Sequence, residues 1–226
     1  MVTQIVSYFF SIIALIAGLV TLFYCYKKEY QAPYRIRNTF PYELIEGKTT
    51  TNVMIGKILM VLSFVALGVY FIVFPGDRSN LGVIKVIAGF INVIGILTVL
   101  SFFGIALVNM KNVKLHMIAD AFFFAFSFIL TTAIAIMGFW TLKDTTASGA
   151  DVKKLILAGV ASLVGIVQMI MFFNPKLRNW AQLEEKSDEN GSMVYSRPKW
   201  FVLAYSEWTF VFTTYLNGLI LFLMFI

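Results

Sequence analysis

Runs of about 20 apolar residues recur along the whole chain and are separated by shorter polar segments. Crossing a bilayer core of about 30 Å takes roughly 20 apolar residues in helical form, so each run predicts a transmembrane helix. The predicted spans are residues 5–26, 53–74, 83–109, 115–142, 154–173 and 200–226. The expected fold class is all-α: a polytopic membrane protein in which a bundle of six transmembrane helices forms one domain over residues 1–226.

Turn-forming residues mark the breaks between these runs. Pro75-Gly76-Asp77 follows the second span, and Asn174-Pro175 ends the fifth, because the residue before a proline leaves the helical region. Residues 111–114 predict a tight turn between the third and fourth spans. The hydrophilic segment 182–199 predicts a loop with a turn at Asn190-Gly191. An even number of spans places both termini on the same side of the membrane.

Composition agrees with an integral membrane protein of the plasma membrane or an endomembrane. The 226-residue chain is 59% apolar and only 13% charged, whereas soluble domains carry about 25% charged residues. Its one cysteine, Cys25, excludes an intrachain disulfide and a cysteine-based metal cluster. The net charge of +6 comes from Lys and Arg beside the apolar runs, which indicates contact with lipid headgroups and not with nucleic acid.

The same positive charges bear on orientation. The segments 27–52, 111–114 and 175–199 share one face of the predicted bundle and hold most of the 18 Lys and Arg residues. Because positively charged loops stay in the cytoplasm, charge alone predicts that these segments are cytoplasmic and both termini lie outside.

Ionisable residues inside the predicted spans are the best candidates for a site. His116 and Asp120 open the fourth span, Glu207 lies in the last, and Lys57 opens the second. A charged group costs roughly 2.5–3.5 kcal/mol at mid-bilayer on insertion scales, so such residues usually have a role. All four enter from the same face, at depths of about 5–10 Å for a rise of 1.5 Å per residue, so we expect them to meet near headgroup depth.

Two kinds of role follow from this cluster. His116 and Asp120 are four residues apart and share a helix face, and a carboxylate beside an imidazole raises its basicity, so with Glu207 they are the catalytic candidates. The ligand-binding candidates are Lys57, Asn109, Gln168 and Trp208. No cofactor is expected, and one histidine with two carboxylates predicts no metal site. The alternative is a purely structural network in which Glu207 pairs with Lys57 or Lys199.

Several marks along the chain resemble one family. They are Pro41-Tyr42 and Gly47 in the first loop, His116-x-x-Ala119-x-x-x-Phe123 in the fourth span, and Glu207-Trp208 early in the last. Together they resemble the Frag/DRAM/Sfk family of six-span membrane proteins, which includes the damage-regulated autophagy modulators and a GPI-lipid-remodelling factor. The first loop departs from the family's Ile-Ser-Asp-x-Gly pattern, since residues 41–47 hold no matching serine or aspartate.

The resemblance implies a role in membrane lipid, and it implies cytosolic termini with a lumenal first loop, opposite to the charge count. Three functions stay open: a protein that binds or regulates membrane lipid through the polar cluster, a lipid-modifying enzyme using His116, Asp120 and Glu207, and an accessory subunit bound to other transmembrane proteins. The chain has no serine-nucleophile, HExxH or phosphate-loop motif, which favours the non-enzymatic interpretation. The expected partners are membrane lipids.

Overall fold

The computed structural model of the protein describes residues 2–46, 50–74, 82–108, 112–144, 152–179, 184–187 and 193–225. Its six long helices are α1 (Val2–Tyr30), α3 (Thr51–Val73), α4 (Gly82–Leu107), α5 (Val113–Asp144), α6 (Val152–Phe172) and α7 (Val202–Phe225). All six are long and apolar enough to cross a membrane, and they lie at the six apolar runs from which the spans were predicted.

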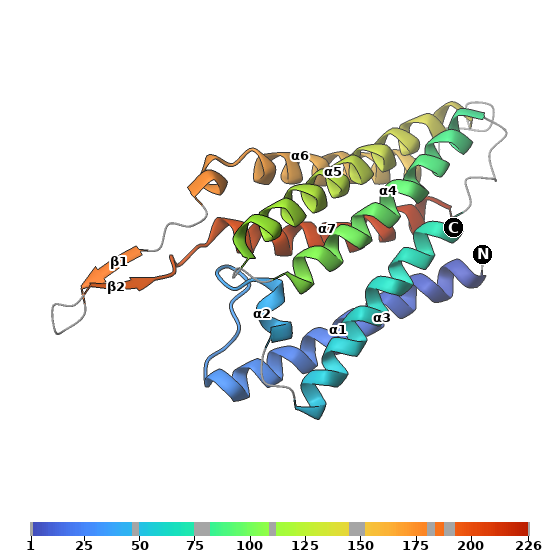
Figure 1. The fold of residues 1–226 in the computed structure, drawn as a ribbon. Coiled ribbons are helices and arrows are strands. Elements are labelled where there is room, and N and C mark those ends of the chain that lie inside the picture. Colours follow the sequence, from blue (N-terminus) through green and yellow to red (C-terminus); the bar gives the residue numbers. More distant parts are fainter. Residues whose placement is uncertain are drawn as a thin grey trace.

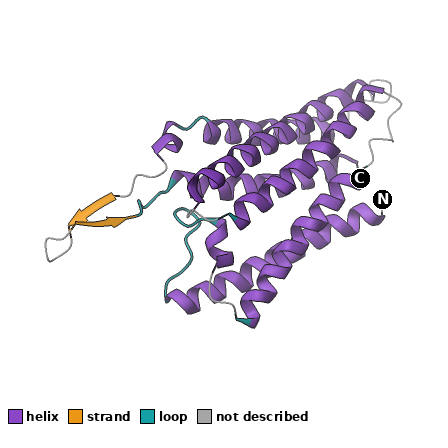
Figure 2. Cartoon of the chain, viewed as in Figure 1, coloured by secondary structure: helices purple, strands orange, loops and turns teal. Residues whose placement is uncertain are grey.

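The connections hold smaller elements that the hydrophobic pattern did not predict. They are the short helix α2 (Pro41–Glu46), the 3-10 helix η2 (Pro175–Asn179) and the strands β1 (Glu184–Ser187) and β2 (Met193–Ser196). The strands form an antiparallel ribbon that pairs Glu184 with Ser196 and projects away from the helices (Figures 1 and 2). The prediction of a plain loop over 182–199 is therefore wrong at the eight strand residues, because the two strands pair through their backbones. Asn190-Gly191 lies outside the described residues.

The helices form two neighbouring groups. Helix α1 packs along α3, and α5 packs between α4 and α6 (Figure 1). Helix α3 also contacts α4, which joins the groups, and α7 lies against α5 and α6 and touches α1 and α3. The first helix begins and the last helix ends at the same end of the bundle (Figure 1).

Helix α7 is the central helix of this arrangement. Its buried residues fall on most faces of the helix: Leu203, Ala204, Ser206, Glu207, Trp208, Phe210, Val211, Thr214, Tyr215, Asn217, Gly218, Ile220, Leu221 and Met224. A polar group on such a helix must find its partner within the protein, because it meets neither water nor lipid.

Small residues allow two helix pairs to approach closely. A Cβ atom at Gly56 of α3 would lie 2.7 Å from Leu22 Cγ of α1, and one at Gly138 of α5 would lie 2.7 Å from Ala158 Cβ of α6. Ala158 and Ala161 are fully buried, which fits close packing of α6 in the bundle.

The outward faces of the helices are apolar. On α1, for example, Val6, Ile13 and Val20 recur every seven residues and are 59%, 64% and 63% exposed. A soluble monomer rarely exposes continuous apolar stripes of this kind, whereas a bilayer covers them at no cost.

Candidate functional site

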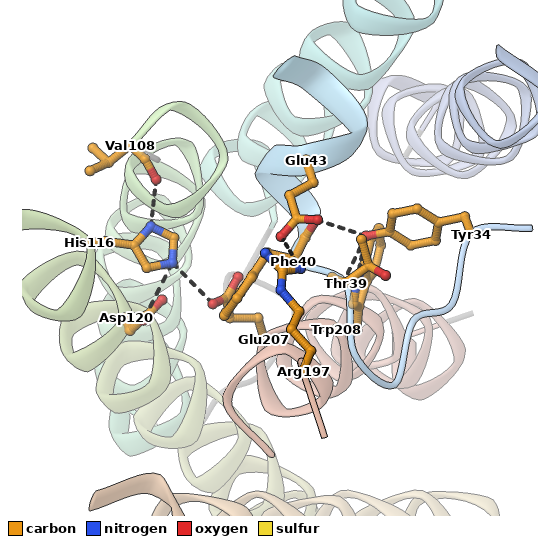
Figure 3. Close-up of polar contacts among 10 residues, drawn as sticks. All are labelled: Tyr34, Thr39, Phe40, Glu43, Val108, His116, Asp120, Arg197, Glu207 and Trp208. Carbon is orange, nitrogen blue, oxygen red and sulfur yellow. Dashed lines mark hydrogen bonds and ion pairs between the residues drawn. The ribbon is translucent and has the colours of Figure 1, made fainter. Parts of the chain in front are cut away.

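The structure brings together His116 and Asp120 from α5 and Glu207 from α7; we call these three residues the charged cluster (Figure 3). His116 Nε2 lies 3.1 Å from Glu207 Oε1 and 3.7 Å from Asp120 Oδ2. The three side chains are 0%, 2% and 0% exposed in chain order. They meet because His116 and Asp120 share one face of α5 at a spacing of four residues, and α7 packs against that helix.

The other imidazole nitrogen, Nδ1, fixes the tautomer of His116. Nδ1 lies 2.5 Å from the carbonyl oxygen of Val108, the residue that follows α4 (Figure 3). A carbonyl oxygen can only accept, so Nδ1 carries a proton and donates it, satisfying one of the carbonyl groups that a helix end leaves free. With Nδ1 protonated, a neutral imidazole presents only the lone pair of Nε2 to Glu207.

The cluster has more acceptors than donors. Both carboxylate oxygens of Asp120 and Oε2 of Glu207 are buried without a hydrogen-bond partner among the described residues. Over the same residues, no Lys or Arg lies within ion-pair distance of either carboxylate. A buried carboxyl group must either carry a proton or be paired with positive charge, so the two carboxyl groups and the imidazole can share either protons or a cation.

Residues 31–44, which we call the cap, cover the cluster at the end of the bundle where α5 begins. The rings of Phe40 and Tyr42 meet the His116 imidazole edge-on, with centroids 5.7 and 5.4 Å away. Phe40, Tyr42 and Leu44 are all buried. Pro41 opens α2 at the first helical position, where its fixed φ suits a helix and its missing N–H costs nothing.

Trp208 holds the cap onto α7. Its indole N–H lies 3.0 Å from the Thr39 carbonyl oxygen and 3.1 Å from the Tyr34 hydroxyl (Figure 3). The Tyr34 hydroxyl in turn lies 2.8 Å from the Phe40 carbonyl oxygen, to which it can donate. Trp208 is 1% exposed, so its ring is enclosed by the protein. Its neighbour Glu207 belongs to the charged cluster, so this adjacent pair serves both the cluster and its cap.

A single ion pair ties the cap to the segment between β2 and α7. Arg197 Nη1 donates to Glu43 Oε1 at 2.6 Å (Figure 3) and also to the Asn38 carbonyl oxygen at 3.3 Å. Burial raises the pKa of the Glu43 carboxyl above its usual 4.5, and the Arg197 guanidinium lowers it by less. Burial also raises the pKa of the Tyr34 hydroxyl, which is therefore neutral and able to donate.

The shifted pKa of Glu43 predicts how pH acts on the cap. A folded-state pKa above the unfolded value means that the folded protein holds this proton more tightly, so the stability from Glu43 is present at low pH and falls as pH rises above 4.5. Glu43→Gln removes this dependence. We therefore expect the melting temperature of the variant, minus that of the wild type, to increase between about pH 4 and pH 7. A difference that stays flat or decreases would show that Arg197 outweighs burial.

The remaining candidates do not join the charged cluster. Gln168 Nε2 donates to Ser127 Oγ at 3.0 Å and to Thr213 Oγ1 at 2.7 Å. Ser127 lies 11 residues beyond His116 on α5, roughly 16 Å deeper. Gln168 lies at this deeper level because α6, with 21 residues, is shorter than α5, with 32. The end of α6 therefore does not reach the level of the charged cluster.

Lys57 and Lys199 do not pair with the charged cluster. Lys57 is half-buried on α3, which packs mainly on α1 and α4, and Lys199 is exposed. Neither forms an ion pair with Glu207, whose partner is His116, so the predicted pairing of Glu207 with a lysine is wrong. Asn109 lies outside the described residues.

An aromatic layer separates the charged cluster from the deeper polar groups. Phe124 of α5 stacks on Phe210 of α7 with centroids 4.3 Å apart, and Phe123 packs beside them. Below this layer Asn217 Nδ2 donates to Thr131 Oγ1 at 2.6 Å. The two polar levels are thus joined by packed rings and not by a hydrophilic path.

This geometry suits the binding of a cation better than proton abstraction. A general base must reach its substrate through a free nitrogen, but here Val108 occupies Nδ1 and Glu207 faces Nε2. An enzyme using His116 as base would have to release Nε2 from Glu207 first.

Comparison with family models, with curated proteins and with solved structures finds no match to this chain.

Proposed function

We propose that this chain is a multi-pass integral membrane protein that binds a membrane phospholipid near one bilayer surface, with both termini on the same side. The six long apolar helices and their apolar outer faces support membrane residence. The marks shared with the Frag/DRAM/Sfk family also favour a role in membrane lipid, whether binding or regulation.

A pocket between the end of α1 and the start of α3 is the observation that carries the proposal. It encloses about 350 Å³ and is lined by Lys28, Glu29, Thr50, Asn52, Tyr24, Cys25 and Val53. Its lining combines charged and polar side chains with apolar ones, which suits a headgroup and the adjoining glycerol. Lys28 supplies the charge that a lipid phosphate needs, and Thr50 and Asn52 supply polar groups beside it.

The pocket is linked to the cap through aromatic side chains. Phe23 and Tyr26 are neighbours of the pocket residues on α1. The ring of Phe23 stacks on that of Tyr34 with centroids 5.1 Å apart, and the ring of Tyr26 meets it edge-on with centroids 5.0 Å apart. Tyr34 in turn contacts Trp208 and the Phe40 carbonyl oxygen. In this proposal, lipid in the pocket steadies the end of α1 and, through Tyr34, the cap above the charged cluster.

A charge-reversal pair tests the lipid proposal. Lys28→Glu is expected to weaken the binding of phospholipid at least about tenfold, because a charge-assisted hydrogen bond contributes about 1.5–3 kcal/mol. Lys27→Glu makes the same change of charge at an exposed neighbour that does not line the pocket, and is expected to leave binding unchanged. The measurement is the rise in melting temperature of the detergent-solubilised, metal-free chain with added phosphatidylserine or phosphatidylethanolamine.

Two results would contradict the proposal. One is a wild-type protein whose melting temperature no phospholipid raises. The other is an equal loss in the Lys27→Glu and Lys28→Glu variants, which would indicate general attraction to the charged bilayer surface in place of a defined pocket.

A further inference from the structure

We propose that His116, Asp120 and Glu207 bind one divalent transition-metal ion of the zinc class. The inference goes beyond lipid binding and does not depend on it, because the charged cluster and the pocket of Lys28 share no residue. With one histidine in the whole chain, the sequence predicted no metal site. The distances and the pairing of the cluster change that expectation.

Two of the three ligand-atom separations are close to those that a metal site requires. A tetrahedral zinc ion with bonds of about 2.0–2.1 Å holds its ligand atoms roughly 3.3 Å apart. His116 Nε2 lies 3.1 Å from Glu207 Oε1 and 3.7 Å from Asp120 Oδ2, on either side of that value. One ligand atom from each residue lies within 4.8 Å of the others, so rotation of the carboxyl groups is enough to enclose an ion.

The unpaired atoms point to a ligand. Both Asp120 oxygens lack a hydrogen-bond partner although the residue is 2% exposed, and one of them faces His116. In the neutral imidazole, Nε2 and Glu207 Oε1 are both acceptors at 3.1 Å, an arrangement that a bound cation makes attractive. A divalent ion would also balance the two carboxylate charges, which no described Lys or Arg does.

The surroundings of His116 match those of a metal-binding histidine. Such histidines usually donate their second ring N–H to a carbonyl or carboxylate oxygen, which fixes the tautomer and turns the lone pair to the metal. Here Nδ1 donates to the Val108 carbonyl oxygen at the C-terminal end of α4, where the helix dipole is negative. The rings of Phe40 and Tyr42 limit access from the surface. We therefore expect a bound ion to exchange slowly.

Imidazole and carboxylate ligands together define the class of metal. Imidazole favours Zn²⁺, Fe²⁺, Ni²⁺ and Cu²⁺, carboxylate favours Mg²⁺, Ca²⁺ and Mn²⁺, and a mixed set is typical of Zn²⁺ and its neighbours. Three protein ligands leave room for a fourth, either water or a second carboxylate oxygen. The alternative to a bound metal ion is protonation of the cluster. An imidazolium with one ionised and one neutral carboxyl group would also balance the charge.

Metal reconstitution separates an ion from protons. The full chain is purified in detergent through an affinity tag that contains no histidine, stripped with a chelator, dialysed and loaded with Zn²⁺ or Co²⁺. We expect about one ion per chain by mass spectrometry, a rise in melting temperature with Zn²⁺, and the visible absorption of Co²⁺ in a low-coordinate N/O site. A wild-type protein that holds neither ion stoichiometrically would overturn the metal site and leave the lipid proposal standing.

Matched variants locate the ion. Asp120→Asn and Glu207→Gln keep the shape of each side chain and remove its charge, and each is expected to weaken Zn²⁺ affinity by about 100-fold or more. Asn217→Leu alters another buried polar residue of α7 below the aromatic layer and is expected to keep the ion. Binding that survives both charge changes would overturn the proposal. If these variants fail to fold, the Co²⁺ spectrum and zinc stoichiometry of the wild type decide.

Discussion

Replacement of Trp208 by alanine is expected to lower the free energy of unfolding by about 3–5 kcal/mol and to release the cap. The indole is 1% exposed, and its N–H reaches both the Thr39 carbonyl oxygen and the Tyr34 hydroxyl. The alanine variant therefore leaves a large cavity in the membrane-surface end of the bundle and removes the donor shared by these two cap groups. Denaturant unfolding in detergent measures the loss of stability.

Cysteine labelling measures the release of the cap separately. Cys25 is the only cysteine in the chain, so a Cys25→Ser background with Leu44→Cys places one thiol in α2, at a position that is 4% exposed in the wild type. Maleimide should label this thiol slowly when Trp208 is present and rapidly in the Trp208→Ala variant. Trp208→Phe, which retains the ring volume but not the N–H, should fall between the two. Equal labelling rates in all three proteins would show that Trp208 does not hold the cap.

The six helices could be predicted from the sequence because the signal is local. Apolar runs such as residues 53–74 and 83–109 have the length that a bilayer requires, and α3 and α4 lie where these runs do. The ribbon β1–β2 could not be predicted in this way. Its strands have only four residues each, Glu184–Ser187 and Met193–Ser196, and their pairing depends on backbone hydrogen bonds between segments too short to show a clear alternating pattern.

The meeting of His116, Asp120 and Glu207 could be predicted because all three lie within a few turns of helix ends on one face. Counting residues from the predicted span ends gives the wrong depth for Gln168, because α6 ends well short of the level where α5 begins. The cap could not be predicted, because it depends on contacts between distant segments, such as Trp208 with Thr39, 169 residues apart. Only Pro41 gave a local signal, as a residue suited to open a short helix.

Central position and charge together explain why the candidate site lies on α7. Because α7 is enclosed by other helices, Glu207 cannot reach lipid headgroups or water and must be satisfied by α5. The same constraint applies to Asn217, which donates to Thr131 of α5. The two helices therefore match polar groups at two levels, and among the described residues only the level at the start of α5 contains charge. This is the level that the cap covers and where a cation could enter when the cap opens.

Gly56→Val is expected to lower the free energy of unfolding by about 3 kcal/mol, at the upper end of the usual cost of overpacking, by separating α1 from α3. A Cβ atom at Gly56 would lie 2.7 Å from Leu22 Cγ and 2.8 Å from Leu22 Cδ2. Leu22 is 1% exposed, and the backbone of Gly18 lies 3.5 Å from the same point, so the clash cannot be relieved by a simple rotation.

A glycine on another helix provides the matched control for this substitution. A Cβ atom at Gly89 of α4 meets no atom within 4 Å, so Gly89→Val introduces the same side chain without a clash and is expected to change stability by about 0.5 kcal/mol or less. Both variants are compared by denaturant unfolding in the same detergent. Because Tyr24, Cys25 and Lys28 of α1 line the pocket together with Thr50 and Asn52 at the start of α3, Gly56→Val should also weaken phospholipid binding, whereas Gly89→Val should not. Equal stability of the two variants would show that α1 and α3 are not packed at the distance on which this pocket depends.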